Sequence, residues 1–451
     1  MARTIDRFWG MGRPARLWLG AVLALLVVVA IGWVIAGHRP PPPPVERLPS
    51  GGGPRSYAEA LARLDRAVET AMRSQRAHPR DWQAAGRLAE ALLSRARLTG
   101  SFGDYAAAQA MLDRALAAAP EGTAPYQSQM ALDLAIDRLD RAAATADAIG
   151  RFAVVAPAMR EAAALTRGDI VFYRGDYARA LALYQRSGGT ADDRERLLRI
   201  ANHHARTGKS DEALALIDRA EGASQHPDAR YLADLAMKRG TIELRRGRWT
   251  EAGHHFDRSA RLLPGWWLAE AYRAQMLALG GHRNQAIAAL LRVARSSASP
   301  VAMDALAALY RAADDRDKSN FWADQARMIW NERLRQFPEA TYAHAVGHIL
   351  AFGDPAAALD LARRDHANRP HGATATALGW ALIANNDPAG ALAIIDPVLR
   401  SPWVSPESHL AAAQAHLLLG RIDQAEAERQ AALGINPRAA DRTAALSWFG
   451  D

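Results

Sequence analysis

Two patterns of hydrophobic residues divide the chain into a short N-terminal part and a long C-terminal part. Residues 17–36 form one run without charges, which as a helix spans about 30 Å, the thickness of a bilayer core. From Ser56 onward, apolar residues recur at the three- and four-residue spacing of amphipathic helices, interrupted by Gly, Asp and Pro. The pattern predicts an all-α protein, with a single transmembrane helix followed by an array of short helices.

The residues around the apolar run predict its orientation. Trp18 and Trp33 lie near its ends, where indole side chains prefer the membrane interface, and Arg13 and Arg16 precede it. Basic residues favour the cytoplasmic side, so residues 1–16 are expected to be a cytoplasmic tail. The bulk of the chain is then periplasmic, anchored in a bacterial inner membrane. The alternative is a cleavable signal peptide, but the run is longer than the about 7–15 apolar residues typical of one.

Residues 37–55 separate the predicted membrane helix from the array. Pro40 to Pro44 are consecutive prolines, which form an extended rod of about 15 Å. Gly51 to Gly53 follow as a flexible joint. We expect a Pro/Gly-rich linker that spaces residues 56–451 from the membrane.

The array contains a repeated turn motif, usually a glycine followed by a polar residue. From Gly175 onward its occurrences lie 33 to 39 residues apart, measured at the third residue of each turn. A degenerate turn is expected near Leu139, within the gap of 72 residues between the first two occurrences. The occurrences are 103–105, 175–177, 208–210, 247–249, 281–283, 315–317, 353–355, 386–388 and 420–422. A period near 34 residues indicates a repeat.

Small and large apolar residues recur at fixed distances after each turn. Three residues past the turn stands an alanine in most units, and four residues further a larger apolar side chain. A methyl group allows two helices to approach closely, and the larger side chain fills the space between them. The alanines are Ala108, Ala180, Ala213, Ala252, Ala286, Ala358, Ala391 and Ala425.

Together these positions resemble the tetratricopeptide repeat (TPR) family over most of residues 56–451. The closest unit begins at Gly240 and has Trp249, Ala252 and Phe256 in the family's positions. The resemblance implies antiparallel helix pairs stacked into a right-handed solenoid with a concave groove.

Three stretches need separate expectations. In the unit at Asp317, Asn320 and Asp324 stand where an alanine and a large apolar residue belong. Residues 124–160 show only a weak pattern. After Pro437, the apolar residues near the end of the chain predict a C-terminal capping helix.

The resemblance also implies partner proteins or peptides bound in the groove, and it implies which residues face them. One such position lies eight residues before the third turn residue, and in this chain it is mostly polar. Trp380 at this position is a candidate anchor for a peptide. The alternative is that these side chains are solvated or buried with satisfied partners. The candidate groove residues are Asp169, Asn202, Thr241, Gln275, Trp380 and Gln414.

Charge and composition change this picture little. The net charge is +8 at pH 7, but seven arginines before Tyr57 face only two acidic residues there, which leaves +3 for the rest. We therefore expect no nucleic-acid partner. Hydrophobic residues make up 49% and charged residues 23%, as in an ordinary folded protein.

The sequence contains no convincing catalytic or cofactor motif. Cysteine is absent, which excludes disulfides, thiol catalysis and zinc–thiolate sites. Lys209 and Ser210 follow a glycine as in a phosphate-binding loop, but His203 replaces the first glycine of that motif. His344 and His348 share a helix face but lack an evident third ligand. We expect no enzyme activity, no cofactor and no metal.

The leading hypothesis is a membrane-anchored scaffold or adaptor that binds proteins or peptides on the periplasmic side, for example within an envelope complex. One alternative is a glycan- or polymer-binding export or assembly factor, which would need more aromatic residues in the groove. Another is an enzyme with an unrecognised site, for which the repeats leave little chain.

Overall fold

The computed structural model describes residues 48–188, 192–446 and 449. The chain divides into two units, Met1–Leu48 and Pro49–Asp451, and the helices below belong to the second unit. The predicted membrane helix, which includes Trp18 and Trp33, lies outside the described residues, as do the preceding Arg13 and Arg16.

Among the described residues, no helix is both long enough and apolar enough to cross a membrane.

The described residues form α-helices joined by short turns, as the sequence pattern predicts. The first half contains α3 (Tyr57–Ala77), α4 (Trp82–Thr99), α5 (Phe102–Ala118), α6 (Tyr126–Ala135), α7 (Leu139–Gly150), α8 (Pro157–Tyr173), α9 (Tyr177–Arg186), α10 (Arg194–Arg206), α11 (Ser210–Ala223), α12 (Ala229–Arg245) and α13 (Trp249–Leu262). The second half contains α14 (Trp267–Leu279), α15 (Arg283–Ser297), α16 (Pro300–Ala312), α17 (Arg316–Gln336), α18 (Tyr342–Phe352), α19 (Pro355–Asn368), α20 (Gly372–Ala384), α21 (Pro388–Leu399), α22 (Pro406–Leu418), α23 (Ile422–Ile435) and the 3-10 helix η1 (Ala444–Leu446).

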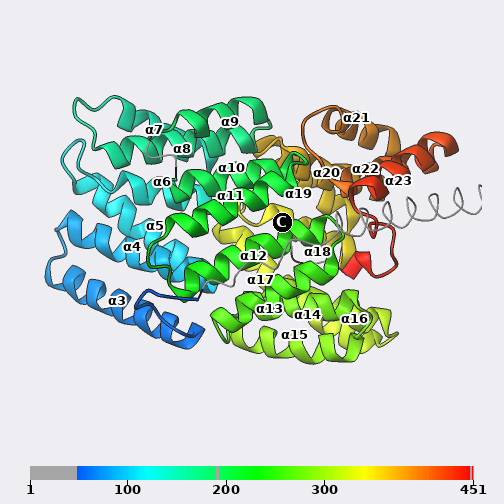
Figure 1. Ribbon diagram of the computed structural model, residues 1–451, viewed down its shortest axis with the longest axis horizontal. Helices are drawn as coiled ribbons and strands as arrows, with labels where there is room; N and C mark the ends of the chain where they lie inside the picture. Colours follow the sequence, from blue (N-terminus) through cyan, green and yellow to red (C-terminus); the bar gives the residue numbers. More distant parts are fainter. Residues whose placement is uncertain (1–47, 189–191, 447–448, 450–451) are drawn as a thin grey trace, which may run out of the picture. The chain divides into compact units, whose positions relative to one another are not determined.

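Consecutive helices pack as pairs, as the repeated turn motif predicts. The pairs run from α4 with α5 to α22 with α23, and α3 packs beside α4 at the start of the array. Neighbouring pairs lie side by side, as the pairs α6–α7 and α8–α9 show (Figure 1). This confirms the predicted helical solenoid.

A small residue on the first helix of a pair faces a large residue on the second. A Cβ atom added to Gly240 would lie 2.4 Å from the ring of Phe256, and one added to Gly168 would lie 2.4 Å from Tyr184. The same holds for Gly379 and Ile395. In each case the absence of a side chain allows the two helices to approach closely, because interiors leave no space for overlap.

The recurrent alanines lie where the sequence pattern predicts. Ala180, Ala213, Ala252, Ala286 and Ala391 are fully buried between paired helices. The weakly patterned stretch follows the same plan, since Ala142 and Ala146 of α7 are also fully buried.

The unit at Asp317 fits the repeat once its turn is placed one residue earlier. Asp314 has a φ of 60°, in the left-handed region where other turns have glycine, and Asp315 caps α17. The helix therefore begins at Arg316, and the buried Ser319 and Ala323 occupy the positions expected for Asn320 and Asp324. The apparent departure from the pattern is an offset of one residue in the predicted turn.

The predicted capping helix after Pro437 takes another form in the described residues. They contain turns and the three-residue η1 there. The segment packs against α14 and α16.

The second half of the array packs along the first half. Four segments of the second half each contact one helix pair of the first half, at or beside the turn inside the pair. The segment after α17 contacts the pair α6–α7, the one after α19 contacts α8–α9, the one after α21 contacts α10–α11, and the one after α23 contacts α12–α13. One of these contacts joins residues 195 positions apart, where the Gly372 amide donates to the Tyr177 hydroxyl at 2.9 Å. The contacts pair Phe337 with Arg138, Gly372 with Tyr177, Val404 with Arg206, and Arg438 with Trp249.

Candidate functional site

A cavity of about 610 Å³ lies between α10, α12 and α14 on one side and α22 and α23 on the other. We call it the groove cavity. Its lining includes both apolar side chains, such as Met237 and Ile435, and polar side chains, such as Asn202 and Thr241. Pockets that bind small molecules or peptide side chains have volumes of about 300–1,000 Å³. The groove cavity is thus large enough for several side chains of a bound segment.

Helical spacing places the cavity-lining residues. Leu198 and Asn202 are four residues apart on α10, and Leu268 and Tyr272 are four apart on α14. Residues at this spacing share one face of a helix, so each helix presents these side chains to the same space.

The charged residues of the cavity largely occur in opposite pairs. Arg246 lies 2.8 Å from Asp211, and Lys238 lies 3.5 Å from Asp234. The Arg206 guanidinium lies over the ring of Trp403, 5.5 Å from its centroid. The lining therefore carries charges of both signs rather than a field of one sign.

Two of the predicted groove residues, Asn202 and Thr241, line the groove cavity. Asn202 is exposed, and the Thr241 hydroxyl donates to the Lys238 carbonyl at 2.9 Å. Both are uncharged polar side chains that present hydrogen-bonding groups beside the apolar lining residues.

Asp169 is held by neighbouring side chains instead. Arg199 Nε donates to its carboxylate at 2.9 Å, and the Tyr184 hydroxyl donates to it at 2.9 Å. Burial raises the pKa of Asp169, and the Arg199 charge opposes that rise. This arrangement ties α8 to α9 and α10.

Gln275 is fully buried, and its side-chain amide binds the backbone of Phe449. Its Nε2 donates to the Phe449 carbonyl at 3.1 Å, and the Phe449 amide donates to its Oε1 at 2.7 Å. The two residues are 174 positions apart, so no local sequence signal indicates this contact.

Trp380 and Gln414 lie further along the array. Trp380 is half-buried and packs against the apolar cluster that includes Leu378 and Ile395. Gln414 is half-buried on α22. Neither is among the described residues that line the groove cavity. Their predicted binding role stays a prediction.

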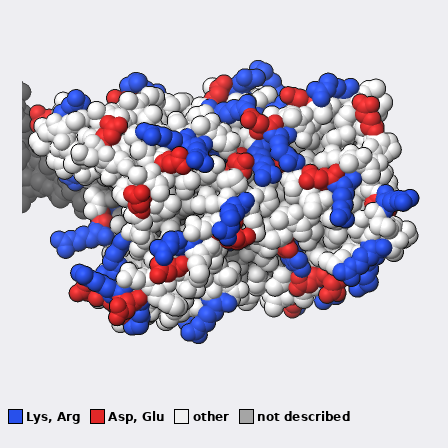
Figure 2. Space-filling model, turned by 180° about the vertical axis from the view of Figure 1, so that it is seen from behind, with Lys and Arg blue, Asp and Glu red and all other residues white. Residues whose placement is uncertain are grey.

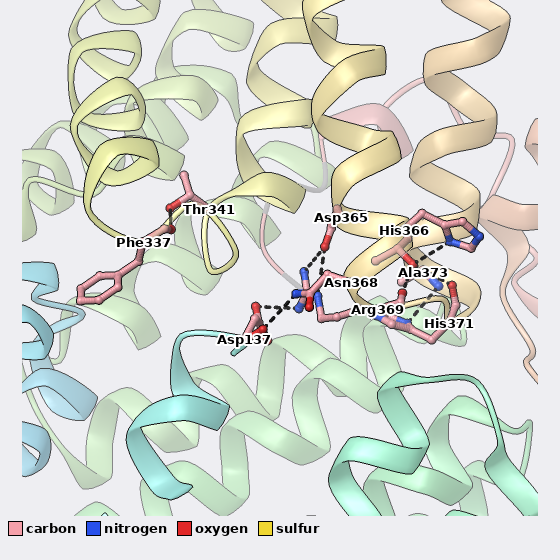
Figure 3. A network of polar contacts seen from close by, with 10 residues as sticks. Asp137, Phe337, Thr341, Asp365, His366, Asn368, Arg369, His371 and Ala373 are labelled. Carbon is pink, nitrogen blue, oxygen red and sulfur yellow. Dashed lines mark hydrogen bonds and ion pairs between the residues drawn. The ribbon is translucent and has the colours of Figure 1, made fainter. Parts of the chain in front are cut away.

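A polar network joins the two halves of the array near Arg369 (Figure 3). The Arg369 guanidinium lies 2.7 Å from Asp137 and 2.8 Å from Asp365. Asn368 Nδ2 donates to the Asp137 carbonyl at 2.9 Å. Burial raises the pKa of Asp137 to about 6, although the Arg369 charge opposes that rise. Two carboxylates thus share one guanidinium in a largely dry contact.

His371 caps α20 in the same network (Figure 3). The Ala373 amide donates to His371 Nδ1 at 3.3 Å, and the imidazole lies beside Tyr173 and Trp403. Burial lowers the pKa of His371 to about 3, with a further contribution from the charge of Arg369. The ring is therefore neutral at physiological pH.

The two histidines considered as metal ligands have structural contacts. His348 Nδ1 lies 2.6 Å from the Asp304 carboxylate, which also accepts from Trp330 Nε1 at 2.8 Å. His344 stacks on the Trp330 ring, 5.7 Å between centroids. Among the described residues, no group of three or more His, Cys, Asp or Glu side chains is placed to hold a metal.

The surface shown in Figure 2 carries basic and acidic side chains interspersed with one another. Neither sign forms a continuous patch on this face. The distribution agrees with the near-neutral charge of residues 57–451.

A scan against protein-family models matched none, and a sequence search of curated proteins found no match. Similar solved structures include the Cut9–Hcn1 hetero-tetramer of the APC/C, with 14% identity and a TM-score of 0.35 over 86% of this chain and 94% of the other. Yeast Tom70 shows 16% identity and a TM-score of 0.34 over 86% and 87%. A tetratricopeptide repeat protein from Parabacteroides merdae shows 13% identity and a TM-score of 0.35 over 56% and 96%.

Proposed function

We propose that this chain is a protein–protein interaction scaffold that binds an extended segment of a partner in the groove cavity. The observation that carries the proposal is the cavity of about 610 Å³ between α10, α12, α14 and the last helix pair. It combines apolar side chains with polar groups from several helices, the composition that suits a segment with both side-chain and backbone contacts.

The chemistry of the cavity favours a protein segment over other ligands. Its charges are mixed and mostly paired, which does not suit a polyanion such as nucleic acid. Tyr272 is the only aromatic residue among the described lining residues, so the stacking surface expected for a glycan is small. Met237, Leu268 and Ile435 instead offer apolar surface for side chains of a peptide.

We further propose that the scaffold is anchored in a bacterial inner membrane with its array on the periplasmic side. The support is the uncharged run at 17–36, which is preceded by Arg13 and Arg16 and has Trp18 and Trp33 near its ends. A reporter that is active only in the cytoplasm, fused after Asp451, tests this orientation. Activity of that reporter would contradict it.

The scaffold proposal is tested by filling the groove cavity. Thr241→Arg places a long charged side chain in the cavity, and we expect at least about a tenfold loss of captured partner from the detergent-solubilised full-length chain. Thr70→Arg is the matched control, because Thr70 is exposed on α3 and is not a lining residue. Partners identified by mass spectrometry should be lost from the first variant and kept by the second. Equal capture by both variants would refute the groove cavity as the binding site.

A further inference from the structure

The C-terminal tail, described at residues 438–446 and 449, occupies a site on α14 in the way a bound peptide would. The Gln275 amide both donates to and accepts from the backbone of Phe449. This double hydrogen bond has the pattern that two residues exchange between neighbouring β-strands, because a glutamine amide carries the same groups as a peptide bond. It recognises backbone, and backbone is common to every extended segment.

An aromatic subsite lies beside this backbone clamp. The Phe449 ring lies 5.7 Å from the ring of Tyr272, which in turn stacks on Phe256 at 4.5 Å. Phe449 is 8% exposed. Aromatic pairs of this kind stabilise a complex beyond the burial of their area. The site therefore selects a segment that carries an aromatic side chain at the clamped residue.

Beyond Arg438, the described tail contacts the rest of the array through η1 and Phe449. The backbone hydrogen bonds of Ala439, Asp441, Ala444 and Leu446 each join residues three positions apart, so they hold the tail to itself. Outside its local turns, the described part of this stretch is held by the packing of η1 on α14 and α16, by Phe449 and by the Gln275 clamp. Segments with few long-range contacts open at a low free-energy cost.

The same face of α14 is continuous with the groove cavity. Tyr272 contacts Phe449 and also lines the cavity, and Gln275 follows it by less than one turn of the helix. If the tail leaves, the buried Gln275 amide loses both hydrogen bonds to Phe449, and losing hydrogen bonds at a buried amide is costly. Another extended segment restores both bonds.

We propose that the Tyr272–Gln275 site is a peptide-binding site for an extended partner segment with an aromatic residue, and that the chain's own tail fills it until such a segment displaces it. The inference rests on the proposed scaffold function. It adds a preference for an aromatic residue and an internal competitor at a site that adjoins the groove cavity through Tyr272. The tail competes at an effective concentration of the order of millimolar, as tethered segments do.

The test uses the full chain and a synthetic peptide of residues 443–451. Phe449→Ala weakens the internal competitor, so we expect the labelled peptide to bind this variant about tenfold or more tightly than the wild-type chain. Adding Gln275→Ala should abolish that binding, whereas adding Gln414→Ala, at the equivalent repeat position on α22, should leave it unchanged. A peptide with alanine in place of Phe449 should not bind.

Several outcomes would overturn the proposal. Equal binding to both chains, or binding that survives Gln275→Ala, would mean that the tail is a fixed structural cover. A wild-type dimer that dissociates on Phe449→Ala would mean that tails are exchanged between copies. If Phe449→Ala does not fold, amide exchange of Phe449 in the isotope-labelled wild-type chain decides instead: saturating unlabelled peptide should accelerate it several-fold, and unchanged exchange would refute displacement.

This experiment is separate from the test of the scaffold function. If Thr241→Arg loses its partners but the tail peptide does not bind, the scaffold proposal stands and the tail-site proposal is refuted. If the tail peptide binds but Thr241→Arg keeps its partners, the tail-site proposal stands and the groove cavity is refuted as the partner's binding site.

Discussion

At the scale of single residues, the array depends on positions where a side chain is absent. Gly240 of α12 faces Phe256 of α13, and Phe256 is fully buried. Gly253, one turn away from Phe256 on α13, has no neighbouring atom within 4 Å of an added Cβ. The two glycines belong to the same helix pair, but only the first is required by packing.

Gly240→Ala should therefore destabilise the array by about 1–3 kcal/mol, because the new methyl group overlaps the Phe256 ring in a well-packed interior. Gly253→Ala should stabilise it by about 0.5–1 kcal/mol, because alanine loses less conformational entropy in a helix than glycine. Urea unfolding followed by circular dichroism should place the two midpoints on opposite sides of the wild-type value. Equal midpoints would show that the helices separate freely enough to accept the methyl group.

At the scale of helices and turns, the sequence predicts those features that residues close together in the chain determine. Helix pairs follow from glycine, alanine and a large apolar residue within one repeat, and the structure confirms them in α12 and α13. The pattern places the turn before α17 one residue too late, because Asp314 takes the left-handed conformation that the pattern assigns to glycine. Among the candidate groove residues, the sequence indicates Thr241 and Gln275 equally. Which of them meets a cavity and which meets the tail depends on contacts 174 residues apart, which a repeat pattern does not encode.

The N-terminus of α20 should give the array a pH dependence. The pKa of His371 is lowered to about 3 by burial, whereas in the unfolded chain it is near 6.5. Below pH 6.5 the unfolded state therefore binds a proton that the folded state does not, and stability falls as pH falls. The loss is about 1.4 kcal/mol between pH 7.5 and 5.5. Asp137 and Asp365 in the same network have raised pKa values and act in the opposite direction.

His371→Asn separates these effects, because asparagine keeps the cap and does not titrate. The carboxylates are common to both chains, so the difference in stability between them isolates the histidine. We expect the variant to gain about 1.4 kcal/mol relative to the wild type between pH 7.5 and 5.5. Urea midpoints at the two pH values measure it. Parallel changes in both chains would show that His371 is not kept neutral in the folded state.

At the scale of the whole array, contacts between the two halves distinguish this solenoid from a linear one. In a linear array each repeat touches only its neighbours, so stability is a sum of local terms and regions unfold separately. Here Trp403 is 5% exposed and packs against Phe172 and Tyr177 from the first half. Such contacts couple distant repeats, and we expect the described array to unfold as one unit.

Trp403→Ala should break that coupling. Removing a buried tryptophan costs about 3–5 kcal/mol, and this loss falls on the contact between the halves. Thermal unfolding should change from one transition to two, and limited proteolysis should cleave one half while the other stays protected. Trp330→Ala is the matched control, because Trp330 is 2% exposed but packs within the second half, where its indole donates to Asp304. The control should lower the melting temperature and keep a single transition. A single transition in Trp403→Ala as well would mean that the repeats within each half, rather than the contacts between halves, set the cooperativity.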